Sequence, residues 1–372
     1  MKTQGRWVFT LACVVISISC LFAVLIGEGI IRVFYPQELG NWTYTRDGLT
    51  LHLPNKRQIS TRFGHAIETN SSGMRDREHE IQKDADVFRI LVLGDSFMEA
   101  NQVKSQDSFS SLLERRLREG SGRSVEVINA GVSGWGTDDE LTYLTRVGVR
   151  YKPNLIIVAM TLHNDVSDNL QEEYHTLWNG QLEERPATLV PWHSFALLKV
   201  KEWLASHSHV YQIFLRAVRS NGVSVQAKDL ESFVGSMLRR SPNGRVAMGW
   251  EMTGKLFEKI VKVAQENNAQ TVVVLLPLLV QVYPEELPRF LASNNLREED
   301  IEIERPQEIM KTLGKILGLP VIDLLPKFVE TKTKCGCALF VKDDGHWNEK
   351  GHLIAAAEVA ENVLASSVMP SK

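Results

Sequence analysis

Short apolar runs alternate with amphipathic segments from Phe88 onward, and this alternation sets the expected architecture. Runs rich in Val, Ile and Leu between turn residues are typical of buried strands, whereas apolar positions three and four residues apart predict helices. Strands are predicted at 88–93, 125–128, 155–160, 271–276 and 320–324. Helices are predicted at 108–117, 138–147, 254–267, 307–317 and 352–365. Such an alternation predicts an α/β fold, in which helices cover both faces of a parallel sheet.

The start of the chain has a different pattern, because residues 7–26 contain no charged side chain. A helix of this length, at about 1.5 Å per residue, spans a hydrocarbon core of about 30 Å. Lys2 and Arg6 precede it, so the positive-inside rule puts the N-terminus in the cytoplasm. A cleaved signal peptide is the alternative, but residues 27–36 offer no clear small-residue cleavage site. We therefore expect a single-pass inner-membrane anchor, with the remaining residues outside the cytoplasmic membrane, which in a Gram-negative bacterium is the periplasm.

Three parts are expected along the chain: a membrane anchor (1–34), a mixed, polar extension (35–87) and a catalytic domain (88–366). Within the last part, the alternation of strands and helices breaks between about 170 and 250. Amphipathic helices are predicted there at 194–206 and 210–219, and the tryptophans in or beside it are Trp178, Trp192, Trp203 and Trp250. Two interpretations remain open: a helical cap beside the active site, or a packed helical subdomain with no role in substrate binding.

Composition narrows the functional classes. The 372 residues are 44% hydrophobic and 23% charged, which is ordinary for a globular protein, and the net charge of −3 with no basic stripe argues against a nucleic-acid partner. No Cys/His array typical of a metal site occurs, and we expect no cofactor. Cys13 and Cys20 lie in the apolar N-terminal segment. Cys335 and Cys337 either form a local disulfide in an oxidising compartment or stay as two free thiols.

Four short polar segments contain the groups that acyl transfer through a serine ester requires. The first is Gly-Asp-Ser at 94–96, the second is the segment 129–134, the third is His-Asn-Asp at 163–165, and the fourth is the segment 343–346 near the C-terminus. The first three directly follow predicted strands. Since the carboxyl ends of parallel strands meet at one edge of a sheet, these segments are expected to lie together there.

Ser96 is the candidate nucleophile, because it ends a strand and opens a helix whose first backbone N–H groups are free. The structural alternative is a serine that only caps the helix. His346 is the candidate base, and its alternative is a loop histidine that caps the helix beginning near Asn348. Asp343, three residues earlier, is preferred over Asp344 as the carboxylate that orients the imidazole.

The negative charge that develops on the substrate oxygen needs hydrogen-bond donors. Gly134 offers a backbone N–H where a side chain would obstruct the acyl group, and Asn164 offers a side-chain amide. Both residue types are also common in plain turns. Loss of one such donor typically lowers the rate by about 10²- to 10³-fold.

Together these segments resemble the four sequence blocks of the SGNH (GDSL-like) hydrolase superfamily over roughly 88–365. The matching positions are Gly94, Asp95, Ser96, Gly134, Asn164, Asp343 and His346. The resemblance implies a flavodoxin-like three-layer α/β/α sandwich of about five parallel strands. It also implies an oxyanion hole formed by the Ser96 N–H, Gly134 and Asn164. Two positions depart from the pattern: Leu162 replaces a glycine, and Phe97 replaces a leucine.

Three functions are compatible with the sequence. The first is a carbohydrate or lipid esterase of the cell envelope, whose partner is an acylated carbohydrate or lipid. The second is an O-acyltransferase that modifies an exported polysaccharide, since His346-Trp347-Asn348 resembles the histidine–tryptophan segment of alginate O-acetyltransferases. The third is a non-catalytic glycan-binding subunit, suggested by the tryptophans of the 170–250 segment.

Overall fold

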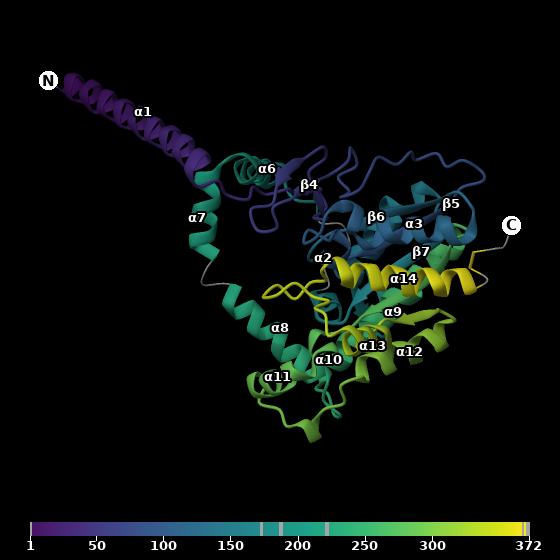
Figure 1. Cartoon of the computed structure of the whole chain (residues 1–372). Coiled ribbons are helices and arrows are strands. Elements are labelled where there is room, and N and C mark those ends of the chain that lie inside the picture. Colours follow the sequence, from purple (N-terminus) through teal and green to yellow (C-terminus); the bar gives the residue numbers. More distant parts are fainter. Residues whose placement is uncertain (1, 172–173, 186–188, 220–222, 367, 370–372) are drawn as a thin grey trace.

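A five-stranded parallel sheet with the order β11-β10-β7-β5-β6 forms the centre of the molecule (Figure 1). In this computed structural model, residues 2–171, 174–185, 189–219, 223–366 and 368–369 are described. The strands are β5 (Phe88–Gly94), β6 (Val125–Gly131), β7 (Leu155–Thr161), β10 (Gln270–Leu276) and β11 (Val321–Asp323). Each lies where an apolar run predicts it, and all neighbouring pairs are parallel, so the predicted α/β sheet is confirmed.

Side chains of the central strands alternate between two apolar cores, one on each face of the sheet. In β5, Leu91 and Leu93 belong to one core, and Ile90 and Val92 belong to the other. The first core is covered by α4 (Thr137–Arg146), α9 (Gly244–Glu266) and α12 (Arg305–Leu317). The second is covered by α3 (Phe109–Ser121), α13 (Leu325–Cys335) and α14 (Glu349–Ala365). The expected three-layer α/β/α sandwich is therefore confirmed.

The five predicted helices around the sheet are present, with differences at their ends. Helix α9 begins at Gly244 rather than at 254, because the Asn243 side chain accepts a hydrogen bond from the Val246 N–H at 3.0 Å and caps it there. Helix α13 was not predicted. It ends at Cys335, which forms a disulfide with Cys337, so the bonded alternative for these two cysteines is the one observed. Short helices are α2 (Ser96–Glu99), α5 (Asp165–Asp168), α10 (Leu279–Val282) and α11 (Leu287–Ser293).

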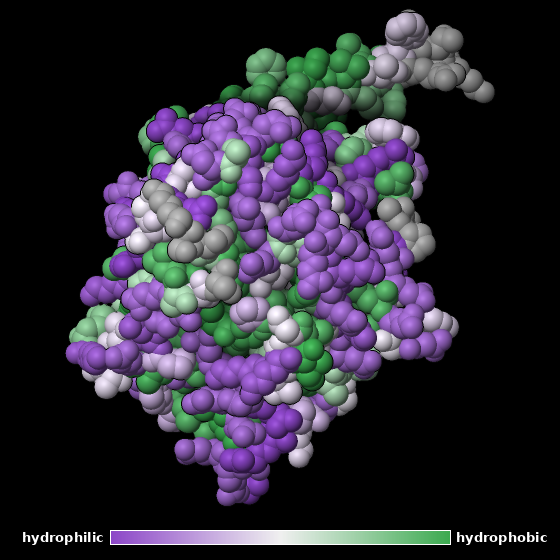
Figure 2. Space-filling view, turned by 90° about the vertical axis from the view of Figure 1, so that its right-hand side faces the viewer, coloured by the Kyte–Doolittle hydropathy of each residue, from purple (hydrophilic) through white to green (hydrophobic). Residues whose placement is uncertain are grey.

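The N-terminal part begins with the long helix α1 (Lys2–Phe34). Its segment Trp7–Phe34 is long and apolar enough to cross a membrane, and its side chains are exposed, as expected for either an anchor or a signal sequence. Figure 2 shows it as a mostly apolar rod above a body whose visible surface is largely polar. Two hairpins follow, β1 (Trp42–Tyr44) with β2 (Thr50–His52) and β3 (Arg57–Ile59) with β4 (Ala66–Glu68).

The segment inserted between β7 and α9 divides into two parts. It contains the hairpin β8 (His175–Trp178) and β9 (Gln181–Glu184), followed by α6 (Trp192–His207), α7 (His209–Arg219) and α8 (Val223–Met237). Helices α6 and α7 lie against the β1 hairpin and α1, whereas α8 runs back toward the sheet (Figure 1). Of the four tryptophans noted in the sequence, Trp178, Trp192 and Trp203 are exposed, and Trp250 is buried in α9.

Candidate active site

The Gly-Asp-Ser turn connects β5 to α2. The Asp95 side chain accepts a hydrogen bond from the Phe97 N–H at 2.9 Å, which caps α2 and makes half-buried Ser96 its first residue. The end of β6 lies against this short helix: a Cβ on Gly131 would lie 2.5 Å from the backbone nitrogen of Glu99. Glycine at 131 therefore permits the close approach of the second polar segment to the serine helix.

His346 connects Ser96 to a carboxylate. Its Nε2 lies 2.7 Å from Ser96 Oγ, and its Nδ1 lies 2.6 Å from Asp344 Oδ1. With the proton on Nδ1 donated to the carboxylate, Nε2 is free to accept the proton of the serine hydroxyl. The ring of Phe97, at a centroid distance of 4.8 Å, packs on the imidazole and limits its orientation. The structure thus brings together Ser96 and His346, as the sequence predicts.

The preference for Asp343 over Asp344 is wrong in this geometry. The turn closes by hydrogen bonds from the Val341 N–H to the His346 oxygen, at 2.8 Å, and from the Asp344 N–H to the Val341 oxygen, at 3.3 Å. Asp343 occupies the left-handed region with φ +58° and is exposed, whereas the Asp344 side chain is 6% exposed and contacts the imidazole. A reach of three residues suits a helical turn, but this tighter turn brings the carboxylate two residues before the histidine into contact.

Arg62, from the loop between β3 and β4, is a site residue that sequence reasoning missed. Its Nη1 lies 2.7 Å from Asp344 Oδ2, and its Nη2 donates to the Asp343 backbone oxygen at 3.1 Å. Burial raises the pKa of Asp344, but the hydrogen bond and charge of His346 and the charge of Arg62 outweigh it and hold this pKa below its ordinary value. Nothing in the local sequence distinguishes this arginine from the other basic residues, since its partner is 282 positions away.

The candidate oxyanion donors follow β6 and β7. Strand register pairs Gly94 with Gly131 and with Ala159, so the three segments start from the same edge of the sheet. Gly134 has φ +83°, a conformation that favours glycine. The Asn164 side chain donates one N–H to Asp168 Oδ2 at 2.9 Å and carries a second N–H for another acceptor.

A buried ion pair connects the serine helix to the Gly134 loop. Glu99 of α2 and His52 of β2 are fully buried, with Oε1 and Nε2 3.0 Å apart, and Glu99 Oε2 accepts a hydrogen bond from the Ser133 N–H at 2.8 Å. Burial raises the pKa of Glu99, but the charge and hydrogen bond of His52 and the bonds from Ser133 lower it to about 2. The carboxylate therefore stays ionised and holds the residue next to Gly134 in place.

Three further carboxyl groups are buried behind the serine turn: Asp95, Glu140 of α4 and Asp165 of α5. Burial is the main cause that raises the pKa of each of the three. Repulsion from neighbouring carboxylates raises the pKa of Glu140 and Asp165 further. The pKa of Asp95 rises to about 6. Among the described residues, no group of three or more His, Cys, Asp or Glu side chains could hold a metal ion.

A cleft of about 790 Å³ borders the triad loop. One side is the loop that contains Asp344 and Gly345, and the other is formed by α8, α10 and α11. His163, next to Asn164, also contributes to its wall. Its apolar lining includes Leu278, Leu279, Val280, Phe290 and Phe340, and its charged lining includes Glu231, Glu286, Arg289 and Lys342. The cleft therefore offers both apolar and charged surface next to Asp344 and Gly345 of the triad loop.

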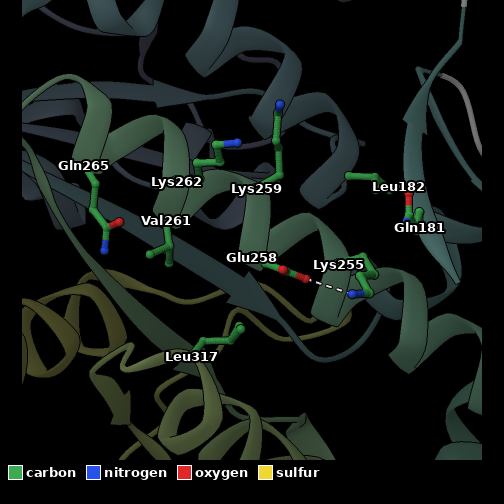
Figure 3. Close-up of a pocket in the computed structure, with 9 residues that line it drawn as sticks. All are labelled: Gln181, Leu182, Lys255, Glu258, Lys259, Val261, Lys262, Gln265 and Leu317. Carbon is green, nitrogen blue, oxygen red and sulfur yellow. Dashed lines mark hydrogen bonds and ion pairs between the residues drawn. The ribbon is translucent and has the colours of Figure 1, made fainter.

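A second hollow, of about 620 Å³, lies along α9 (Figure 3). Its lining is formed by Gln181, Leu182 and Leu317 together with side chains of α9, among them Lys255, which forms an ion pair of 2.9 Å with Glu258. None of the four polar segments contributes to it. Gly134 lines a smaller hollow of about 90 Å³, together with Ser133 and Asp138. The cleft of about 790 Å³, whose lining includes His163 and Asp344, is the larger of the two that border the polar segments and is the candidate substrate site.

Comparison with known proteins gives one family match. A sequence model of the GDSL-like Lipase/Acylhydrolase family matches residues 92–354. A search among curated proteins finds no match. Similar solved structures include TesA, with 13% identity, a TM-score of 0.39, and coverage of 76% of this chain and 99% of that chain. The acetyl xylan esterase AlAXEase is 13% identical, with a TM-score of 0.42 and coverage of 74% of this chain and 99% of that chain. The psychrotrophic esterase EstA from Pseudoalteromonas sp. is also 13% identical, with a TM-score of 0.38 and coverage of 74% of this chain and 96% of that chain.

Proposed function

Because the chain belongs to the GDSL-like lipase/acylhydrolase family, of the SGNH hydrolase superfamily, we propose that it is a serine-dependent hydrolase of a carbohydrate or lipid ester in the cell envelope. The observation that carries this proposal is the continuous hydrogen-bonded chain from Ser96 through His346 to Asp344. Such a chain activates a serine hydroxyl, which is a weak nucleophile without a neighbouring base.

The reaction proceeds in two halves. Ser96 Oγ attacks the ester carbonyl while His346 Nε2 takes the hydroxyl proton, and Asp344 stabilises the imidazolium that forms. The oxyanion accepts hydrogen bonds from the backbone N–H groups of Ser96 and Gly134 and from the amide of Asn164. His346 then returns the proton to the departing alcohol, which leaves an acyl-enzyme. Water, deprotonated by His346, releases the carboxylic acid and restores the serine hydroxyl.

The cleft supports a substrate larger than a simple acetate ester. Its volume of about 790 Å³ lies within the range of pockets that enclose whole small molecules. We infer that the apolar wall near Leu279 and Phe340 holds the hydrophobic part of the substrate, whereas Arg289 and Lys342 contact its polar or anionic part. This division fits an acylated carbohydrate or a lipid ester.

Two features support a place in the envelope. Helix α1 fits a single-pass inner-membrane anchor, with Lys2 and Arg6 on the cytoplasmic side and the catalytic domain in the periplasm. The disulfide between Cys335 and Cys337 suits an oxidising compartment outside the cytoplasm.

The two other functions lack a specific observation. Trp347, which suggested an acyltransferase, is fully buried against Phe97 and Phe328 at centroid distances of 5.2 Å each, so packing of the triad loop accounts for it. The exposed tryptophans that suggested a glycan-binding subunit, such as Trp178, are not among the cleft lining.

The proposal is tested with the full chain in detergent, p-nitrophenyl esters of increasing acyl length, and a fluorophosphonate probe. We expect Ser96-dependent acid release and labelling, both abolished in Ser96→Ala and His346→Ala and retained in Ser71→Ala, a matched change at an exposed serine. Labelling at a residue other than Ser96, or hydrolysis that persists in Ser96→Ala, would refute it. An oligosaccharide acceptor that captures the acyl group in place of water would instead identify a transferase.

A further inference from the structure

Helix α7 has an apolar face that the described residues leave partly exposed. Ile213, Phe214 and Val218 are 37%, 59% and 60% exposed, and their spacing puts them on one side of the helix. Gln212 and Arg216 lie toward the other side, where each hydrogen-bonds to neighbouring residues. An apolar side of a helix that is exposed to solvent marks a candidate contact surface for a membrane or another protein.

The start of α7 is fixed to the end of α1. Glu28 of α1 accepts hydrogen bonds from the His209 N–H, the Val210 N–H and the Ser208 hydroxyl at 3.0, 3.0 and 2.9 Å, so a side chain of one helix caps the other. The Arg32 side chain, one turn further along α1, donates to the His207 oxygen at 2.8 Å. The position of α1 therefore determines where α7 begins.

The depth of α1 in a bilayer then determines the depth of α7. The uncharged stretch 7–26 is 20 residues long and fills a hydrocarbon core of about 30 Å. Residues 27–34 continue the helix into the headgroup layer, which is where Glu28 caps α7. Figure 1 shows α7 leaving the end of α1 at a steep angle and standing clear of the sheet domain.

The charge of this region suits an anionic surface. Residues 28–35 and helix α7 together contain three arginines, Arg32, Arg216 and Arg219. The one acidic residue, Glu28, pairs with Arg32 at 3.0 Å, so the charges of the two other arginines remain in excess. Exposed Phe34 and Tyr35 at the end of α1 add aromatic side chains of the kind that gather at membrane–water interfaces. An apolar face flanked by cations and aromatic rings is typical of a helix that lies in the interface of an anionic bilayer.

We propose that α7 is a second membrane contact, with Ile213, Phe214 and Val218 inserted among the lipids of an anionic bilayer surface. This proposal rests on the membrane anchor of the proposed function and adds a role for the inserted segment. One anchor leaves the catalytic domain free to tilt and rotate, whereas a second contact beside it fixes the orientation of the domain. The cleft beside His346 is then held at a constant height and angle above the lipid surface.

The test measures the depth of single labelled positions in the full chain, reconstituted into vesicles of phosphatidylcholine and phosphatidylglycerol. Cys13 and Cys20 are replaced by alanine, the disulfide is left in place, and an NBD fluorophore is attached in the variants Phe214→Cys, Arg216→Cys and Ile316→Cys. Ile316 is a matched control, because it is a 73% exposed apolar residue of α12. Lipid-borne nitroxides report contact with the bilayer, and iodide reports contact with water.

We expect the label at 214 to be quenched by nitroxide lipids and to be at least about threefold less accessible to iodide than the labels at 216 and 316. Equal iodide accessibility at 214 and 316 would overturn the proposal. Protection from iodide without nitroxide quenching, together with energy transfer between copies, would overturn it in favour of self-association. A parallel variant, in which Cys20 is the labelled position, reports on α1 itself. A label at 20 that lies in water would overturn the proposed membrane anchor. A label at 20 in lipid, with the label at 214 in water, would overturn only the proposed membrane contact of α7.

Discussion

Replacement of Asp344 by asparagine is the most direct test of how the triad is built. Asparagine has nearly the same shape as aspartate, so Asp344→Asn changes the charge and the hydrogen-bond polarity with little change in packing. Asp343→Asn is a matched control one residue away, on an exposed side chain that does not contact the imidazole.

The size of the effect follows from two losses. At a separation of about 4 Å and an effective dielectric constant of about 20, a carboxylate stabilises an imidazolium by about 4 kcal/mol. The neighbouring guanidinium of Arg62, 2.7 Å from the same carboxylate, offsets part of this attraction and leaves about 3 kcal/mol, or about 10²-fold in rate. The introduced amide also donates to Nδ1 of His346, which moves the ring proton to Nε2 and removes the acceptor for Ser96. We therefore expect kcat to fall by about 10³-fold.

The assay is steady-state hydrolysis of the best p-nitrophenyl ester by the full chain, with thermal unfolding as a control for folding. KM is expected to stay within about twofold, because the carboxylate acts through His346 and not through ground-state binding. Asp343→Asn is expected to retain wild-type kcat. A large loss of activity in Asp343→Asn, with near-normal activity in Asp344→Asn, would refute the assignment.

Further predictions concern the residues around the triad. Arg62→Ala removes a charge that competes for Asp344, but it also removes both contacts that hold the triad loop, so kcat should fall by only about two- to fivefold. Arg57→Ala, in the same hairpin, should leave kcat unchanged in the same assay. Glu99→Gln should lower the free energy of unfolding, measured in urea, by at least about 2 kcal/mol, because the buried His52 loses its carboxylate partner. Glu68→Gln, which changes an exposed ion pair, should alter the free energy of unfolding by less than about 0.5 kcal/mol. Burial raises the pKa of Glu140, so the native state holds a proton that the unfolded chain releases. As the pH rises from the pKa of Glu140 in the unfolded chain toward its pKa in the native state, the free energy of unfolding therefore declines by about 1.4 kcal/mol per pH unit. Glu140→Gln should therefore raise Tm at pH 8 much more than at pH 5, and an equal change at both would contradict this.

The sheet was predictable because its strands are buried on both faces. A strand such as β7, with every residue buried, must be an uninterrupted apolar run, and such runs are visible in any sequence. The start of α9 was not predictable in this way. Its first turns, from Gly244, contain Gly and Arg among the apolar residues, so the apolar positions do not recur at helical spacing there. Its beginning depends on the cap at Asn243, which is a local hydrogen bond rather than a periodic signal.

In the candidate site, too, some residues could be predicted from the sequence and others could not. Ser96, Gly134 and Asn164 follow predicted strands, so the parallel topology alone predicts that they start from one edge. The choice between Asp343 and Asp344 depended on backbone dihedral angles in a loop without regular structure, where spacing gives no direction for a side chain. The contacts of Arg62 and His52 join segments far apart in the chain, and a single sequence contains no signal for such pairs.

These distant contacts change what should be regarded as the catalytic unit. The family match begins at residue 92, yet the extension before it supplies Arg62 to the triad carboxylate and His52 to the pair that holds the Gly134 loop. It also supplies Arg75, whose buried guanidinium donates to the oxygens of Glu99, Ala100 and Val103 at 2.6–2.8 Å, directly after the serine helix. Without the extension these carbonyl groups would lose their hydrogen bonds in the interior, which is unfavourable. Because the same extension joins the sheet domain to α1, the segment that leads to the proposed membrane anchor is also part of the support of the candidate active site.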